Sequence, residues 1–524
     1  MPRAVIASGL AAVAALSLYL TTPTLEYGFV YDDHQNIVER EPAWKQGWQD
    51  FLSTRHWGLG RHAVLLSYDL DRADPLQPRR FHRTNAILAA TVSVLVVLTA
   101  SGLGLPVLGA VIAGLLFAAH PLQADAVAGL AGRAELLAAL CVLAALCLHI
   151  RGYPGGRAAR IVAAALLFIG LASKESAISL LPLLVAHDAL LTDSSRRHEL
   201  RATYIGYAIA LAAWVVFVSA NFADVSPILH VDNPIAHDPW YVRVPKASYV
   251  LGEYLQLALF PASQQLDYSY AVLEPTVAAG MVALTLWAVA AVIALVLARR
   301  YPLAIFCTVW FPLCFVATGN VAFPIGTIMA ERLAFLAVAG PCMLGGLAAA
   351  RVAGNNRTRI VITLAFAAVA VTGLGQQFRD RSSAWKDDVT YHSRAASESP
   401  RSAKAHYNLG LVHARAGDLA LAAASFESAC EIHPGFRAAT IDLVQVQTQR
   451  GELAQAAATY RDYLDAEPLD TDIIKAVVML ELSVGPHDAT LLSAQKLVEL
   501  DPADMERRLL LGRVETALST RINP

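Results

Sequence analysis

The chain has 524 residues, of which 56% are hydrophobic and only 16% are charged. Soluble domains average roughly 45–50% apolar and 25% charged residues, and the apolar excess here lies before about residue 376. The formal net charge of -2 argues against a nucleic-acid partner, which would require a strongly basic face. We therefore expect a membrane protein with no nucleic-acid partner.

Apolar stretches of spanning or near-spanning length begin at the N-terminus. Residues 4–20 resemble a signal peptide, but the preceding end is weakly basic and the Thr21, Thr22 and Pro23 that follow form a poor cleavage site. We predict an uncleaved first span. Ten further stretches lie at residues 84–101, 105–119, 134–150, 158–172, 175–191, 202–219, 276–298, 301–318, 332–349 and 359–376. The sequence thus predicts about 11 spans, judged against the roughly 20 residues that a bilayer requires.

Arginine-rich loops alternate with charge-poor loops along this pattern, and such loops mark the cytoplasmic side of a membrane protein. They contain Arg151, Arg157 and Arg160, then Arg196, Arg197 and Arg201, then Arg299 and Arg300, and finally Arg351, Arg357 and Arg359. The alternation requires that residues 248–261, a shorter stretch with Glu253 and Gln256, be re-entrant or interfacial. The N-terminus is then inside, and everything after residue 376 is outside.

The polar C-terminal region has the period of a tetratricopeptide array. Pro434, Pro468 and Pro502 recur every 34 residues, and each closes a predicted helix pair. The expected packing positions are Leu409, Gly410, Ala422, Phe426 and Ala429 in the first unit and Leu443, Ala456 and Tyr460 in the second. We predict an all-α protein with a transmembrane domain over residues 1–377, which includes an external loop at 21–83, and a connecting helix over 378–402. An α-solenoid of repeats follows at 403–436, 437–470 and 471–504, with a C-terminal capping helix.

The six cysteines show neither a disulfide framework nor a metal-ligand spacing. Cys141, Cys147, Cys307, Cys314 and Cys342 fall within apolar stretches, and Cys430 falls within the repeats. We assign them to packing and expect no metal.

Asp32 and Asp33 form a carboxylate pair just beyond the first predicted span. Adjacent carboxylates repel each other, so their pKa values tend to separate and one of them can act as a base. A solvated turn is the structural alternative for such a pair.

Further ionisable residues lie at the same predicted outer boundary of the membrane. They are His120, Arg133, Glu135, Lys174, Glu175, Glu331 and Arg332. Ionisable groups at such depth are costly, usually face the protein interior and mark functional sites. Taken singly, Lys174 and Glu175 also fit a local salt bridge, and His120 also fits a helix cap. Their convergence with the Asp pair favours a polar site on the outer face.

Several of these motifs resemble the transmembrane and tetratricopeptide-repeat O-mannosyltransferases, relatives of the dolichyl-phosphate-mannose protein mannosyltransferases with the C-type glycosyltransferase fold. The matching stretches are residues 29–33, 81–85, 120–135, 173–175, 267–270, 323–327 and 330–332. The last two are the most specific. The chain departs from the family pattern at Glu135, where the family often has Asp, at Asp125, where it often has Glu, and in its shorter repeat array.

The resemblance implies a metal-free, cofactor-independent, inverting transfer of a sugar from a polyprenyl-phosphate donor to an acceptor hydroxyl on the outer side. In that scheme Asp32 is the general base and Asp33 orients it or the acceptor. The lipid phosphate is then held by cations, for which the candidates are Arg332, Lys174 and Arg133. The residues left to position sugar hydroxyls or to fix those cations are His82, His120, Glu135, Glu175 and Glu331.

Three functions remain open at this point: a mannosyltransferase for Ser/Thr hydroxyls of proteins, a C-type glycosyltransferase for a lipid or polysaccharide, and a non-enzymatic membrane scaffold. His406, Tyr407 and Asn408 on the repeats favour a peptide acceptor. The Ala-, Leu- and Arg-rich composition suggests a high-GC bacterium, with an undecaprenyl-like carrier and a site outside the inner membrane. In a eukaryotic host the same topology places the site in the endoplasmic reticulum lumen.

Overall fold

A computed structural model of the chain describes residues 2–46, 48–53, 61–152, 156–192, 197–221 and 228–522. These described residues form helices and connecting loops without a strand, which confirms the all-α prediction. They divide into two compact units. The membrane unit contains the residues up to Leu266 and Glu274–Tyr391, and the repeat unit contains Asp267–Leu273 and the residues from His392 onward.

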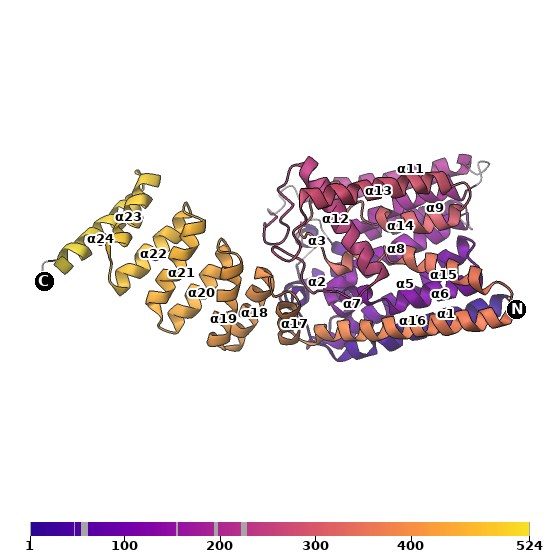
Figure 1. Ribbon diagram of the computed structural model, residues 1–524, viewed down its shortest axis with the longest axis horizontal. Coiled ribbons are helices and arrows are strands. Elements are labelled where there is room, and N and C mark those ends of the chain that lie inside the picture. Colours follow the sequence, from indigo (N-terminus) through magenta and orange to yellow (C-terminus); the bar gives the residue numbers. More distant parts are fainter. Residues whose placement is uncertain are drawn as a thin grey trace. The chain divides into compact units, whose positions relative to one another are not determined.

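The membrane unit consists of sixteen α-helices within the described residues, joined in places by short 3-10 turns (Figure 1). They are α1 (Pro2–Thr21), α2 (Ala43–Gln46), α3 (Trp48–Ser53), α4 (His62–Asp71), α5 (Pro78–Gly102), α6 (Val107–Ala119), α7 (Ala124–Ala128), α8 (Arg133–Ile150), α9 (Arg157–Leu171), α10 (Leu180–Leu190), α11 (Arg197–Asn221), α12 (Trp240–Leu259), α13 (Val277–Leu297), α14 (Pro302–Leu313), α15 (Ala339–Ala353) and α16 (Arg357–Ser383).

Each of the 11 predicted apolar stretches overlaps one of these helices, but the helices differ in length. Among the described residues, six segments are long and apolar enough to cross a membrane: Ala4–Glu26, Pro78–Gly102, Leu130–Ile150, Ala202–Ser219, Val277–Leu297 and Arg357–Lys386. A seventh arises if α6 and the following Pro121–Ala128, bent by 55°, form one span. Helix length and composition therefore identify fewer spans than the about 11 that the sequence predicts.

Two of the shorter helices begin late because a 3-10 turn replaces their first residues. Glu175–Ser179 precedes α10, and Glu331–Ala334 leads toward α15. Irregular backbone at membrane depth is tolerated where protein covers it, and both turns have mostly buried residues. These two turns carry the predicted site residues Glu175, Glu331 and Arg332, and Lys174 directly precedes the first turn.

Helices α1, α5, α6 and α16 run side by side (Figure 1). Small residues allow α6 to approach α15 closely: a Cβ atom on Gly346 would lie 2.1 Å from the carbonyl oxygen of Gly109. By contrast α13 has only Gly280 buried and exposes Leu286, Val289 and Ile293. An apolar helix left uncovered by protein is the expected form of a helix that faces lipid.

The predicted re-entrant stretch at residues 248–261 forms the second half of α12. This helix begins at Trp240, contains Pro245 and packs against α13. Arg243, Lys246 and Glu253 interrupt its apolar character, and α12 is not among the six span candidates. That α12 does not cross the membrane stays a prediction. Arg196, in one of the predicted Arg-rich loops, lies outside the described residues.

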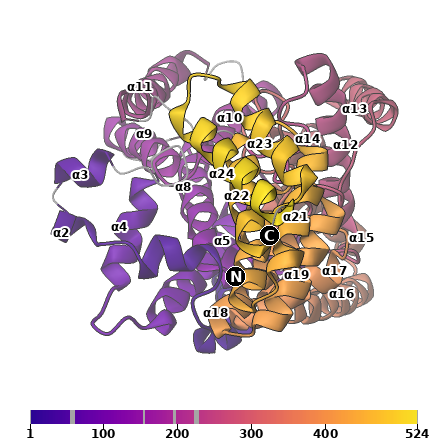
Figure 2. The ribbon, with the colours of Figure 1, turned by 90° about the vertical axis from the view of Figure 1, so that its left-hand side faces the viewer.

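The long segment between α1 and α5 is folded. Its short helices α2, α3 and α4 lie together (Figure 2). Ile37, Phe51, Leu65 and Tyr68 form a buried apolar cluster there with Phe81 of α5. This packing fixes the position of the preceding turn, which carries Asp32 and Asp33.

The repeat unit is a row of antiparallel helix pairs. Its helices are α18 (Ala403–Ala416), α19 (Leu419–Ile432), α20 (Arg437–Gln449), α21 (Leu453–Ala466), α22 (Thr471–Val484), α23 (Asp488–Leu500) and α24 (Met505–Ile522). Pro434, Pro468 and Pro502 each follow the second helix of a pair, as the period predicts. A Cβ atom on Gly410 would lie 2.5 Å from the Phe426 ring, so the small residue is required for the pair to close.

The connection between the units differs in detail from a single helix over 378–402. Helix α16 continues to Ser383, a 3-10 turn follows at Ala384–Lys386, and α17 spans Asp388–Glu398. The separate segment Asp267–Leu273 belongs to the repeat unit because the Asp267 carboxylate accepts a hydrogen bond from Ser402 Oγ at 2.6 Å. A motif that precedes α13 in sequence therefore folds with the repeats.

Candidate functional site

The two neighbouring aspartates of the first loop lie in different environments. Asp33 is 1% exposed, and its two carboxylate oxygens accept the backbone N–H groups of Val30 and Ala131, each at 3.0 Å. Asp32 is partly exposed. The Asp33 side chain therefore ties this loop to the turn before α8, whereas the Asp32 side chain is in partial contact with solvent.

Burial also separates the two carboxyl groups electrostatically. Desolvation raises the pKa of Asp33 to about 8, the backbone bond from Val30 opposes this shift, and the charge of Asp32 adds to it. Both Asp33 oxygens are already bonded to backbone N–H groups inside the protein, so they are poorly placed to meet an acceptor hydroxyl. Of the pair, Asp32 is thus the better candidate to accept a proton.

Tyr391 marks the point where distant parts of the membrane unit meet. Burial raises its pKa well above the ordinary value; the charges of Asp125 and Asp32 add to the shift, and Arg332 opposes it. The pKa of Tyr391 thus responds to the charges of Asp32, Asp125 and Arg332, which are its charged neighbours. Tyr31 stacks on Tyr391, with ring centroids 5.8 Å apart and an interplanar angle of 19°. We call these five residues the Tyr391 cluster.

Arg332 is the cation of this cluster. Its Nη1 lies 3.8 Å from Asp125 Oδ2, and its backbone N–H donates to the same oxygen at 3.2 Å. The Arg332 side chain is 29% exposed, whereas the Asp125 side chain is 12% exposed. A guanidinium that is loosely paired and partly exposed is suited to bind a phosphate. Asp32, the candidate base, belongs to the same cluster.

Lys174 is close to the cluster but is paired more tightly. Its Nζ lies 2.7 Å from Glu135 Oε1, and both side chains are 5% exposed. Ser176 Oγ donates to the other Glu135 oxygen at 2.8 Å. Beside them, Arg61 Nη2 lies 3.2 Å from Glu175 Oε1. The two predicted acids here fix cations, which is one of the roles that the resemblance implies.

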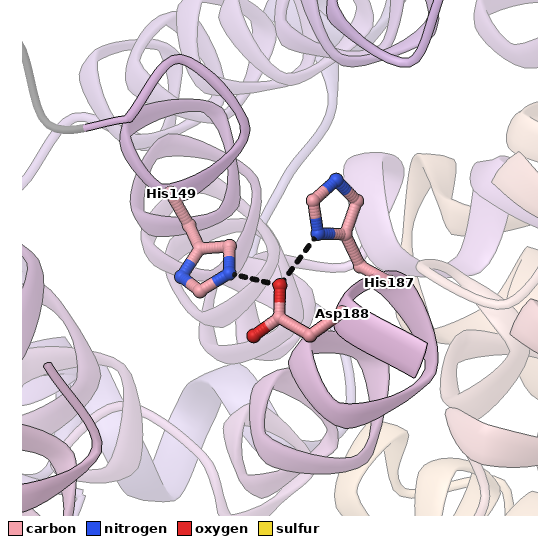
Figure 3. Close-up of side chains that lie close together, drawn as sticks. All are labelled: His149, His187 and Asp188. Carbon is pink, nitrogen blue, oxygen red and sulfur yellow. Dashed lines mark hydrogen bonds and ion pairs between the residues drawn. The ribbon is translucent and has the colours of Figure 1, made fainter. Parts of the chain in front are cut away.

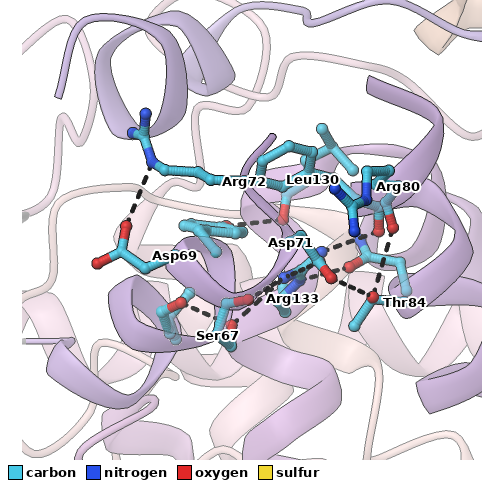
Figure 4. A network of polar contacts seen from close by, with 12 residues as sticks. Ser67, Asp69, Asp71, Arg72, Arg80, Thr84, Leu130 and Arg133 are labelled. Atoms are coloured by element: carbon cyan, nitrogen blue, oxygen red, sulfur yellow. Dashed lines mark hydrogen bonds and ion pairs between the residues drawn. The ribbon is translucent and has the colours of Figure 1, made fainter. Parts of the chain in front are cut away.

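Arg133 lies in a buried network (Figure 4). Its side chain is 0% exposed, and Nη1 lies 2.7 Å from Asp71 Oδ2. Thr84 donates to the other Asp71 oxygen at 2.7 Å, and the guanidinium lies 4.7 Å from the centre of the Tyr68 ring. Its remaining contacts are with Asn85 Oδ1 and with the carbonyl oxygens of Ser67 and Phe81. This geometry links α4, α5 and α8.

The two predicted histidines have backbone partners. His82 Nε2 lies 3.3 Å from the carbonyl oxygen of Gly28, in the loop that leads to the aspartates. His120 Nε2 lies 3.0 Å from the carbonyl oxygen of Ala258, and its Nδ1 accepts the Leu122 N–H at 3.3 Å. His120 therefore caps the turn after α6, as the structural alternative predicts, and joins it to α12.

Glu331 is also held by the chain itself. Arg381 contacts both of its carboxylate oxygens, at 3.0 and 3.3 Å, and the side chains of this pair are 4% and 2% exposed. Gln264 Nε2 and the Gln265 backbone N–H donate to the same carboxylate at 2.6 and 3.0 Å. Glu331 thereby anchors α16 and the loop after α12 directly beside Arg332.

The comparisons with known proteins agree with these observations. Residues 413–478 match the family model described as a tetratricopeptide repeat. The chain is also similar to proteins named protein O-mannosyl-transferase: F38B6.6 of Caenorhabditis elegans, 25% identical over 62% of this chain, and Tmtc2 of Drosophila melanogaster, 32% identical over 43% of it. Human TMTC3 is 25% identical over 73% of the chain.

The chain is a relative of the transmembrane and tetratricopeptide-repeat O-mannosyltransferases. The matched parts cover 46%, 26% and 47% of these three relatives, so the chain spans less than half of their length. The predicted resemblance is thus confirmed.

Sequence reasoning missed several members of the site as the structure has it. Tyr31, Asp125 and Tyr391 belong to the Tyr391 cluster, and Arg61 and Arg381 hold the predicted acids. Tyr31 and Asp125 lie within or next to the quoted motifs, which was the available signal. Arg61, Arg381 and Tyr391 lie in polar segments without a motif, so only the fold brings them to the site.

Proposed function

We propose that this protein is an O-mannosyltransferase that moves a sugar from a polyprenyl-phosphate donor to Ser/Thr hydroxyls of a protein, with inversion. The observation that carries the proposal is the placement of a partly exposed carboxylate, Asp32, and a partly exposed guanidinium, Arg332, around the same tyrosine. Base and phosphate-binding cation are the two groups that a single displacement from a lipid phosphate requires. The names of the similar proteins supply the sugar and the acceptor class.

In this mechanism Asp32 accepts the proton of the acceptor hydroxyl as its oxygen attacks the anomeric carbon. The bond between that carbon and the phosphate oxygen breaks on the opposite face, and the lipid phosphate leaves as an anion. Arg332 stabilises the charge that develops on the phosphate. Electrostatic stabilisation of this kind is usually the largest single contribution to catalysis. No metal takes part in this scheme.

The other predicted site residues hold this pair in place. Lys174 is the second candidate for the phosphate, provided that it exchanges part of its contact with Glu135 for the ligand. Arg133 has structural partners on every side, so we assign it to positioning instead of phosphate binding. Asp33 fixes the Asp32 loop, and Glu331 fixes the loop of Arg332.

The repeat unit is proposed to bind the acceptor protein. Of the three residues that favour a peptide, Tyr407 donates to Asp442 at 2.9 Å and packs against Phe426, so its hydroxyl serves the repeat itself. His406 Nε2 lies 3.1 Å from the carbonyl oxygen of Pro400. Asn408 is partly exposed and is the best placed of the three to meet an acceptor.

The function is tested by incubating the purified full-length protein with radiolabelled polyprenyl-phosphate sugars and an extract of the compartment outside the membrane. Label from the mannose donor is expected in protein, released by the β-elimination that cleaves O-linked sugars. The Asp32→Asn variant at matched concentration is the control and should transfer little. Label confined to lipid or polysaccharide would instead support a glycan acceptor. Absence of transfer from every donor would contradict the enzyme function and favour the non-enzymatic scaffold.

The side of the membrane is tested separately. We propose that the site and the repeats face the outside, in keeping with the Arg-rich loops. A reporter fused after Gln377 should be active only if it is exported, and one fused near Arg196 only if it is cytoplasmic. Cytoplasmic repeats would contradict the proposal, since the aspartates and the array would then face opposite compartments.

A further inference from the structure

A second group of ionisable side chains lies at the other end of α8, away from the proposed catalytic residues. His149 is in the last turn of α8, and His187 and Asp188 are at the end of α10. Glu135 and His149 are separated by 14 residues of one helix, which at 1.5 Å per residue is about 20 Å. The proposed mechanism uses none of these three side chains.

The three side chains point toward one another (Figure 3). His149 Nε2 lies 2.7 Å from Asp188 Oδ1, and His187 Nδ1 lies 3.0 Å from the same oxygen. One ligand atom from each residue falls within 4.8 Å of the others. The side chains of His149, His187 and Asp188 are 1%, 10% and 11% exposed, so this is a built interior cluster.

The second oxygen of the carboxylate is fixed from outside the cluster. Tyr204 of α11 donates its hydroxyl to Asp188 Oδ2 at 2.8 Å, and Thr192 donates to Oδ1 at 3.0 Å. Metal-binding carboxylates are commonly oriented by such outer hydrogen bonds. Tyr204 therefore presents Asp188 to the two imidazoles in the way that an outer residue presents a metal ligand.

We propose that His149, His187 and Asp188 bind a divalent metal ion of the Zn²⁺ class. Two imidazole nitrogens and one carboxylate oxygen are a ligand set that zinc sites use, with water in the fourth position. Mg²⁺ and Ca²⁺ prefer oxygen ligands and do not fit two imidazoles. The site clamps the ends of α8 and α10 and, through Tyr204, the start of α11.

Binding requires the three ligand atoms, which lie within 4.8 Å of one another, to reach the spacing of a metal site. Ligand atoms about 2.0–2.1 Å from a tetrahedral zinc are roughly 3.3 Å apart, whereas the present contacts to Asp188 are 2.7 and 3.0 Å. Each imidazole nitrogen therefore moves a few tenths of an ångström away from Asp188 Oδ1. The metal takes the lone pairs of His149 Nε2 and His187 Nδ1, and protons held there in the hydrogen-bonded form go to the other ring nitrogens or to solvent.

The test uses the full-length protein, purified in detergent with a tag that contains no histidine and then treated with a chelator. Co²⁺ is titrated as the probe, because its visible absorption reports low-coordinate nitrogen and oxygen ligands. We expect one equivalent to bind, to be displaced by Zn²⁺ and to resist displacement by Mg²⁺. Binding should also raise the midpoint of thermal unfolding.

Variants separate this site from adventitious binding. His149→Gln and Asp188→Asn should lose at least a hundredfold in Co²⁺ affinity, and Tyr204→Phe, which removes only the outer hydrogen bond, should lose about ten- to a hundredfold. His237→Gln is the matched control, because His237 is exposed and lies outside the cluster. Wild-type protein that binds no Co²⁺, or binding that is equal in His149→Gln and His237→Gln, overturns the proposal. If His149→Gln and Asp188→Asn fail to fold, the Co²⁺ affinities of the wild type and Tyr204→Phe test the proposal.

Discussion

The membrane unit and the repeat unit use charged side chains in opposite ways. In the membrane unit Arg381 and Glu331 are 4% and 2% exposed, and they join segments that are 50 residues apart in sequence. In the repeat unit Lys475 and Glu506 are 37% and 70% exposed and lie on neighbouring helices. An ion pair in the first setting has no water to replace a lost partner, whereas in the second water replaces it at once.

This difference predicts that the two units respond differently to mutation. The repeat unit is held by many similar small contacts, among them Gly410 against Phe426, and it repeats them along the chain. The membrane unit buries ion pairs such as Arg381 with Glu331, where removal of one partner leaves a buried charge. Function is therefore expected to be concentrated in the membrane unit, and the following changes are ordered by the size of their expected effect.

Asp32→Asn should lower turnover by roughly 10²- to 10⁴-fold with donor affinity little changed, because the amide keeps the shape but cannot take a proton. Turnover is measured at saturating donor and matched membrane expression. Asp33→Asn is the comparison and should lose less, since Asp33 is buried and orients the loop. Wild-type turnover in Asp32→Asn would refute the mechanism, and a larger loss in Asp33→Asn would move the base to Asp33.

Arg381→Met should destabilise the membrane unit by about 3–5 kcal/mol, the cost of leaving one partner of a buried ion pair. The change is measured as the denaturant midpoint of the protein in detergent. The double variant Arg381→Met with Glu331→Gln removes both charges and should recover much of the loss. Equal loss in the single and double variants would show that packing at Arg381 matters more than charge.

Arg332→Gln should weaken donor binding by about ten- to a hundredfold, the scale of one charge-assisted hydrogen bond. Binding is measured directly with polyprenyl phosphate, so that a loss of turnover is not mistaken for it. Lys174→Gln tests the second candidate for phosphate binding. This change also leaves the buried Glu135 carboxylate without its cation, so a loss of stability is expected as well. If Arg332→Gln binds the lipid phosphate like wild type, the phosphate lies elsewhere.

Stability should fall as pH rises from about 4 to about 8, through the titration of Asp33. Burial raises its pKa to about 8, so in this range the folded state holds a proton that the unfolded chain releases, and deprotonation favours unfolding. Asp33→Asn should flatten this part of the profile. The measurement is the unfolding midpoint of both proteins across that pH range; parallel profiles would exclude Asp33 as the source.

Lys475→Ala in the repeat unit should change the free energy of unfolding by less than about 1 kcal/mol, as is usual for exposed ion pairs. It serves as the low-effect limit of the comparison with Arg381→Met, measured in the same denaturant series. A loss as large as that of Arg381→Met would show that exposure does not predict the weight of an ion pair here.

The sequence by itself determined the all-α class, the apolar stretches and the repeat unit. The 34-residue recurrence of Pro434, Pro468 and Pro502 reflects contacts between neighbouring helices, and local contacts leave a periodic pattern in the chain. The motifs around Asp32 and Arg332 were also legible, because ionisable residues stand out in an apolar background. Their shared position at the predicted outer boundary of the membrane could be inferred from the predicted spans alone.

Only the tertiary structure decided which of those residues are open and which are enclosed. Asp32 and Asp33 are adjacent and chemically identical, yet the N–H of Ala131, 98 residues away, helps to bury one of them. Tyr391 likewise reaches the site only because α16, which precedes it, packs against α1 at the beginning of the chain. The His149, His187 and Asp188 cluster shows the same limit, since His149 lies 38 residues before His187 without a recognisable spacing. Burial and pKa depend on contacts between distant segments, and such contacts leave no period in the sequence.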